Sequence, residues 1–187
     1  MMIMKKSTLS LIALFCMLSA SLMAQTQKGS VMIGGTAGFS SSKTGDYTET
    51  DINFSPMAGF FIMDQLAIGG GLNVGVSSLK FDGETSSVTS VGVQPMVRYY
   101  FNGSGKARFF GQANFQYASV KVEELDAQSG IGFGAGVGID FFLNDHVAIE
   151  GLLGYNSFKV KDADDATGTF GLQIGVAAFI GGGSDDK

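Results

Sequence analysis

The chain has 187 residues, a formal net charge of −5 and a single cysteine. This length suits one domain, and the acidic balance excludes proteins that bind nucleic acid or anionic lipid through net positive charge. The 28 glycines and two prolines are unusual for a globular enzyme, and they lack the regular period of a collagen.

Residues 1–24 have the layout of a secretory signal peptide. Two lysines precede an apolar run from Leu9 to Leu18, and small residues lead to Ala24. The run is shorter than the roughly 20 residues of a transmembrane helix. We therefore predict export with cleavage after Ala24. Without those two lysines the chain carries 10 basic and 17 acidic residues, a net charge of −7.

The only cysteine, Cys16, lies inside this signal segment. The mature protein should therefore have no thiol, no disulfide and no cysteine metal site. We expect neither a metal nor a cofactor.

After the signal segment, apolar residues alternate with glycine and polar residues at a period of two, which is typical of β-strands. Eight such runs follow one another, at 31–40, 52–62, 66–77, 91–101, 107–117, 131–143, 147–156 and 170–178. Short turns after the second, fourth and sixth runs, at 64–65, 102–106 and 144–146, alternate with longer polar links. The pattern predicts an all-β fold, an eight-stranded antiparallel up-and-down barrel over residues 25–180, with a short polar tail at 181–187.

The composition of the two phases indicates which one faces outward. One phase consists of Val, Ile, Leu, Phe, Tyr and Ala, and the other mainly of Gly, Asn, Gln and Ser. An eight-stranded barrel is so narrow that side chains fill it, so the bulky phase must point out. Such an apolar outer surface is consistent with lipid and not with water. Only a closed barrel leaves no unpaired strand edge in hydrocarbon, so we predict a transmembrane β-barrel.

Three segments share an aromatic pair, an Asn or Asp turn and an apolar restart. They are FFIMDQLAIG from residue 60, FFLNDHVAIE from residue 141 and, with a longer turn, YYFNGSGKARFFG from residue 99. With these segments, nearly all of the mature chain resembles the small outer-membrane β-barrel family of Gram-negative bacteria, of the OmpA/OmpX-like or OmpW-like kind. The resemblance implies a bacterial outer-membrane location and porin-like architecture. It also implies insertion by the barrel assembly machinery, which recognises a terminal strand ending in an aromatic residue; here Ile180 follows Phe179.

Four charged residues belong to the inward phase: Arg98, Arg108, Asp140 and Glu150. All lie close to the short turns, so they should meet at one level near the periplasmic end. Buried charges are tolerable only when paired, which predicts an Arg–carboxylate network. The network would be a polar plug, which the narrow lumen favours, or alternatively a gate or proton path.

An enzymatic role is not expected. Asp140 and Glu150 could form an acid–base pair, but neighbouring arginines would keep both ionised. His146, the sole histidine, sits in a short turn and has no catalytic partner set in the sequence. We interpret it as a solvated turn residue.

Each of the later long links begins with lysine and then becomes acidic. The lysines are Lys80, Lys121, Lys159 and Lys161. They are either solvated residues that snorkel at the membrane boundary or contacts for lipopolysaccharide phosphates, with the carboxylates holding bridging Ca²⁺ or Mg²⁺. Outer-membrane lipid and lipopolysaccharide are thus the expected partners of a monomer that binds no nucleic acid.

The aromatic pairs and the prolines carry two structural expectations. Phe60, Tyr99 and Phe141 should form an aromatic girdle at the periplasmic interface, while their successors point inward as apolar plugs. Pro56 and Pro95 lack a donor for the strand ladder, which predicts a bulge or a local break at each.

Two functions remain open from the sequence. The first is a non-enzymatic barrel with a structural or surface-interaction role, such as adhesion or loop presentation. The alternative is a small channel or carrier for ions or small hydrophobic compounds.

Overall fold

The computed structural model describes residues 24–44, 47–81, 84–101, 105–122 and 126–181. Residues 1–23 of the predicted signal peptide, 102–104 of the predicted turn and 182–187 of the polar tail lie outside these residues. A short 3₁₀ helix, η1 (Ala24–Thr26), precedes eight strands. They are β1 (Val31–Thr44), β2 (Tyr47–Met63), β3 (Leu66–Phe81), β4 (Glu84–Tyr100), β5 (Ala107–Val122), β6 (Gln128–Phe142), β7 (Val147–Val160) and β8 (Thr167–Ile180).

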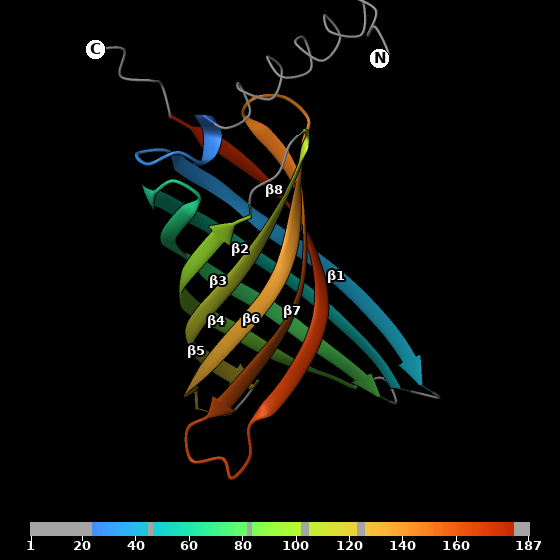
Figure 1. Cartoon of the computed structure of the whole chain (residues 1–187). Helices are drawn as coiled ribbons and strands as arrows, with labels where there is room; N and C mark the ends of the chain where they lie inside the picture. The colour runs from blue at the N-terminus through green and yellow to red at the C-terminus, as the bar shows by residue number, and fades with distance from the viewer. Residues whose placement is uncertain (1–23, 45–46, 82–83, 102–104, 123–125, 182–187) are drawn as a thin grey trace, which may run out of the picture.

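The strands form a closed antiparallel barrel in the order of the sequence, β1 to β8, as Figure 1 shows. The predicted fold class is therefore confirmed. Among the described residues, no helix has both the length and the apolar character needed to cross a membrane.

The strands are longer than the alternating apolar runs, at 14 to 17 residues each. A tilted membrane strand needs only about 9–11 residues. The excess lies at the long-link end, where β1 extends to Thr44 and β2 begins at Tyr47. Much of the first long link is therefore strand, paired from Ser40↔Asp51 to Thr44↔Tyr47.

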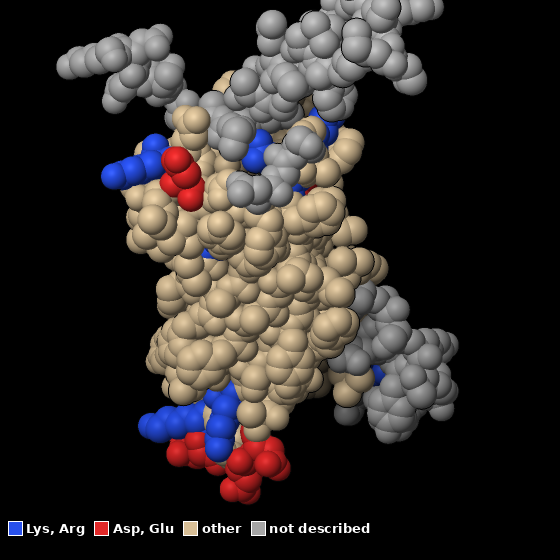
Figure 2. Space-filling model, viewed as in Figure 1, with Lys and Arg blue, Asp and Glu red and all other residues tan. Residues whose placement is uncertain are grey.

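The side chains point as the alternation predicts. On β4, Val91, Val93 and Val97 are exposed on the outer wall, while Met96 and Arg98 are buried inside. The outer wall between the two ends is a broad uncharged band, visible in Figure 2, and the described charges gather at both ends. This distribution matches a wall surrounded by hydrocarbon.

The prolines interrupt pairing without shifting the register. The β2–β3 ladder passes from Phe54↔Val74 to Met57↔Gly71, and the skipped positions include Pro56. The β4–β5 ladder likewise skips Pro95. The prediction of a bulge or a local break is confirmed at both prolines in the form of a local break, and neither proline has a bulge. The register shift in β2–β3 lies instead between Phe61 and Met63.

The seam that closes the barrel is short. β1 and β8 pair only from Val31↔Ile180 to Thr36↔Gly175, at the end where the chain enters and leaves the barrel. Residues 167–174 of β8 are exposed on both faces. Closure is therefore most complete at the end of the barrel that carries the short turns, which also holds the buried core.

Candidate functional site: a charged and aromatic plug

The four charged wall residues are all inside the barrel and essentially inaccessible. Arg98, Arg108, Asp140 and Glu150 are each exposed by 1% or less. Alternation places them inside, because each shares a strand face with glycine, polar or aromatic lumen residues. Their strands, β4 to β7, are successive neighbours in the barrel wall.

Arg98 forms an ion pair with Glu150. Nη1 donates to Oε2 of Glu150, and Nη2 donates to Oε1 at 3.1 Å. This two-bond geometry matches the planar fork of a guanidinium to a carboxylate. Because β4 and β7 are not adjacent, the pair spans the lumen.

Gln112 and Phe110 on β5 complete the surroundings of Arg98. The Gln112 side-chain oxygen accepts from Nε at 2.9 Å and from Nη2 at 2.6 Å. The Phe110 ring lies 3.9 Å from the guanidinium carbon, a cation–π arrangement. These contacts offset much of the cost of removing the charge from water.

Asp140 is bound by a residue that the sequence analysis treated as apolar. The Tyr100 hydroxyl donates to Oδ2 of Asp140 at 2.7 Å and also accepts from Arg98 Nη1 at 3.3 Å. Tyr100 and Arg98 are two residues apart on one strand face, and that spacing was the signal that could have revealed the link.

The strand register places the remaining charges side by side. Arg108 lies directly opposite Asp140 across β5–β6, and Asp140 lies opposite Glu150 across β6–β7. The structure thus brings all four predicted residues to one level, with Tyr100 and Gln112 as additional members. We call this set of six the charged layer.

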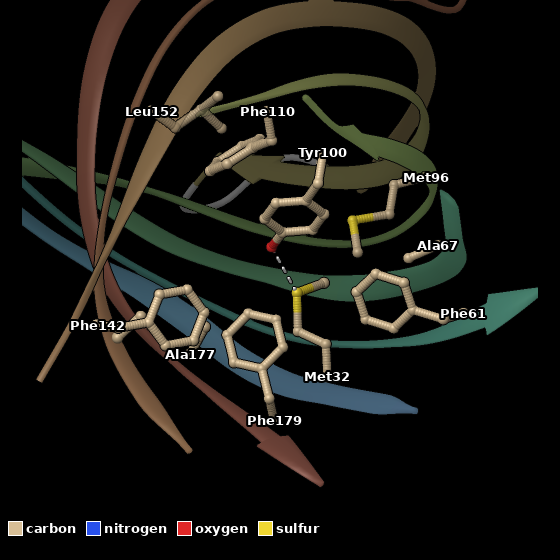
Figure 3. Packing of buried hydrophobic residues seen from close by; sticks show 11 residues of the cluster. Met32, Phe61, Ala67, Met96, Tyr100, Phe110, Phe142, Leu152, Ala177 and Phe179 are labelled. Carbon is tan, nitrogen blue, oxygen red and sulfur yellow. Dashed lines mark hydrogen bonds between the residues drawn. The ribbon is translucent and has the colours of Figure 1, made fainter. Parts of the chain in front are cut away.

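An aromatic layer lies next to the charged layer, and we define it as Phe61, Tyr100, Phe110, Phe142 and Phe179. The centroids of rings in contact within this layer are 5.1 to 6.4 Å apart. Figure 3 shows these rings around Met32, whose sulfur lies 3.3 Å from the Tyr100 hydroxyl oxygen. Phe61, Tyr100 and Phe142 occupy the inward positions predicted for them.

The segment before β1 lies across the short-turn end of the barrel, a feature that the sequence pattern did not predict. Gln25, Thr26 and Ser30 are buried, although all three are polar. Gln25 donates its side-chain amide to the main-chain oxygen of Asp145, and the Thr26 oxygen accepts from the Gln65 main-chain N–H at 2.7 Å. The segment therefore ties the 64–65 turn and the 144–146 turn together, and we call it the cap.

The other predicted residues lie outside the plug. Phe60, Tyr99 and Phe141 are 43–50% exposed on the outer wall near the short turns. His146 is exposed in its turn, with Nδ1 3.3 Å from the main-chain oxygen of Phe179. Lys80, Lys121, Lys159 and Lys161 are exposed at the opposite end of the strands. Within the described ranges, no group of three His, Cys, Asp or Glu residues is placed to hold a metal.

Little open space remains beside the plug. A cavity of about 40 Å³ reaches Arg98, Gln112 and Glu150. A second cavity of about 90 Å³, lined by polar residues such as Asn114, Asn156 and Gln173, lies farther along the lumen. One water needs roughly 10–15 Å³ of such space, so each cavity has room for only a few waters.

Comparison with known proteins agrees with this architecture. The family model described as outer membrane protein beta-barrel domain matches residues 10–178. Among solved structures, outer membrane protein OprG from Pseudomonas aeruginosa is similar, with a TM-score of 0.58 and 13% identity over 85% of this chain and 99% of that chain. Neisserial surface protein A has a TM-score of 0.54 and 16% identity over 80% of this chain and 94% of that chain. No curated protein sequence matches the chain.

Proposed function

Because this chain belongs to the outer membrane protein beta-barrel domain family and resides in the outer membrane, we propose that it is a plugged, non-enzymatic barrel. Its role is structural or surface-interactive, and it presents its long links outside the cell. One observation carries this proposal: the ion pair between Arg98 and Glu150 spans a lumen that the aromatic layer also fills.

Opening the lumen would separate buried charges. Arg98 and Glu150 are 0% and 1% exposed, so breaking their pair would leave each charge without its compensating partner. Removing one partner of a buried pair typically costs about 3–5 kcal/mol. The cap and the aromatic layer block the same path at the periplasmic end. A stable plug is therefore favoured over a gate or proton path.

The same burial argues against acid–base chemistry at the carboxylates. Asp140 is 0% exposed and bonded to Tyr100, while Glu150 is bonded to Arg98. A catalytic carboxylate must come within hydrogen-bond reach of a substrate proton. These two side chains are engaged with the protein instead.

Planar-bilayer conductance of the refolded protein tests the proposal. The wild type should give no conductance steps, and neither should Arg98→Ala nor Glu150→Ala, because the aromatic layer remains. A combined variant, Arg98→Ala with Phe61→Ala, Tyr100→Ala and Phe179→Ala, removes the ion pair and most of the aromatic layer, so it should conduct and show that the assay detects a water path. Regular steps from the wild type would contradict the plug.

A second candidate, a carrier for small hydrophobic compounds, is favoured by one feature of the wall. An outer groove of about 560 Å³ and the 40 Å³ inner cavity share five lining residues. They are Pro56, Met57, Gly71, Leu72 and Gln94. The β2–β3 ladder is broken at Pro56, so the wall between groove and lumen is weakest here.

Two matched variants, each replacing an alanine by phenylalanine, distinguish a carrier from a plugged barrel. Ala58 lines the outer groove, whereas Ala113 faces outward on β5 away from it. A carrier should bind the apolar dye N-phenylnaphthylamine saturably. Ala58→Phe should abolish that binding and Ala113→Phe should preserve it. No saturable binding, or equal loss in both variants, would eliminate the carrier.

A further inference from the structure

A second outer groove, of about 330 Å³, lies at the extracellular end of β5, β6 and β7. It is lined by Tyr117, Ser129, Gly130, Ile131, Lys159, Val160, Lys161 and Asp162. The strand register puts Tyr117 opposite Ile131 and Ile131 opposite Lys159, so these three side chains form one outward row. We call this feature the lysine groove.

The two lysines are held by strand geometry. Lys159 and Lys161 are two residues apart and so share the outward face, about 7 Å from each other along the chain. The Lys161 main-chain N–H donates to the Ser129 oxygen at 2.7 Å, which continues the β6–β7 pairing past the end of β7. Both side chains are exposed. Strand pairing thus fixes the main-chain positions of both lysines at the rim of the groove.

The floor below the lysines is apolar. The side chains of Tyr117 and Ile131 are 50% and 48% exposed on the outer surface of the barrel. One register step toward the membrane centre, Phe115 and Phe133 pair edge to face at 5.2 Å. An elongated molecule with a phosphate at the extracellular end of the groove and acyl chains toward the membrane centre would match this order of charged and apolar surfaces.

Acidic residues of the β7–β8 link lie beside the lysines, and Figure 2 shows both kinds of charge at the lower end of the barrel. The described contact of Lys159 is from Nζ to the main-chain oxygen of Asp164 at 3.1 Å. That bond uses one of three donors and does not neutralise the ammonium charge. The lysines are therefore available as phosphate ligands, in keeping with basic groups at membrane boundaries.

From this arrangement we propose that the lysine groove binds the bisphosphorylated glycolipid of the outer leaflet, lipid A. Lys159 and Lys161 bind one phosphate, while Tyr117, Ile131 and the Phe115–Phe133 pair contact an acyl chain. Lys121 lies on the same outward face of β5, four residues beyond Tyr117, and adds positive charge to the patch. Lys80 lies apart from it on β3.

Direct binding to the refolded protein in detergent, measured by native mass spectrometry, tests this site. The probe is bisphosphoryl lipid A. The double variant Lys159→Gln with Lys161→Gln should weaken lipid A binding about 25-fold. This value follows from about fivefold for each lysine near a charged lipid. The matched control, Lys80→Gln, should leave affinity unchanged. Heat-modifiable gel migration confirms that each variant is folded.

A variant that keeps every charge tests the apolar half of the site. Ser129→Phe should fill the groove and weaken lipid A binding. Lipid A without its phosphates should bind the wild type and the lysine double variant equally, and phosphatidylglycerol should compete poorly. The proposal is overturned if the double variant binds as the wild type does, if Lys80→Gln causes the same loss, or if phosphatidylglycerol competes as well as lipid A.

Discussion

Arg98 on β4 and Glu150 on β7 are joined by two hydrogen bonds across the lumen, although two strands lie between them in the wall. The pair therefore connects opposite parts of the barrel directly. Arg98 also bonds to Tyr100 and Gln112 of the charged layer, so removal of the pair should affect more than one contact.

Arg98→Met should lower the free energy of unfolding by about 3–5 kcal/mol, because Glu150 would be left buried without its counter-charge. Urea unfolding in detergent, followed by gel migration, measures this. The double variant Arg98→Met with Glu150→Leu removes both charges and should recover much of the loss. If the two single losses simply add in the double variant, the pair does not act as a unit.

Tyr100→Phe should destabilise the barrel by about 1.5–3 kcal/mol, the usual range for a hydrogen bond to a charged group. The change deletes the hydroxyl that binds Asp140 and leaves the ring in the aromatic layer. The matched control is Tyr99→Phe, because that hydroxyl contacts the Gln65 side chain on the exposed surface at 3.3 Å. Equal effects of the two substitutions on the unfolding midpoint would rule out a special role for the buried hydroxyl.

Gly138→Ala should destabilise the barrel by about 1–3 kcal/mol through overpacking. An added Cβ at this position would lie 2.2 Å from the far end of the Phe110 ring and 2.7 Å from the main-chain oxygen of Gly151. Gly171→Ala is the control, because a Cβ there meets nothing within 4 Å. Thermal unfolding of both variants tests the expectation, and a Gly138→Ala protein as stable as its control would show that Phe110 can move away freely.

Pro56→Ala should strengthen the β2–β3 ladder, because alanine supplies the main-chain N–H that proline lacks. Hydrogen exchange at residues 71–73 should slow relative to the wild type. The amides at residues 74–76, whose ladder is intact, serve as the internal reference. Unchanged exchange at 71–73 would show that the break does not depend on the missing donor.

The sequence predicted the membrane-facing wall well because the outer phase is apolar on every strand. The strand ends were harder to predict. Where Ser, Thr, Asp and Glu replace the apolar residues, alternation in hydropathy disappears although the backbone pairing continues, as at Ser40↔Asp51.

The plug was predicted in its members but not in its connections. A charge on the inward phase can be read from position alone, whereas the choice of Glu150 over Asp140 as the partner of Arg98 depends on how far each side chain reaches. The cap was missed because Gln25 and Ser30 are polar, and hydropathy does not indicate polar residues that are buried through main-chain hydrogen bonds.

The proline positions show why a bulge did not form. Pro56 keeps its register partner Gly35 on the β1 side, and Pro95 keeps Gly70 on the β3 side. Each proline is unpaired only with the strand on its other side, β3 for Pro56 and β5 for Pro95. The ladder can therefore omit these positions without an inserted residue.

The cap has a consequence for the order of folding. Gln25 and the Asp145 that it contacts are 120 residues apart, and the turn that contains Asp145 exists only when β6 and β7 have paired. The contact of the segment that leads into the first strand therefore requires the β6–β7 hairpin to have formed and to lie beside that segment. A probe at Gln25 would thus report, as a single local signal, that residues from both ends of the barrel sequence have come together.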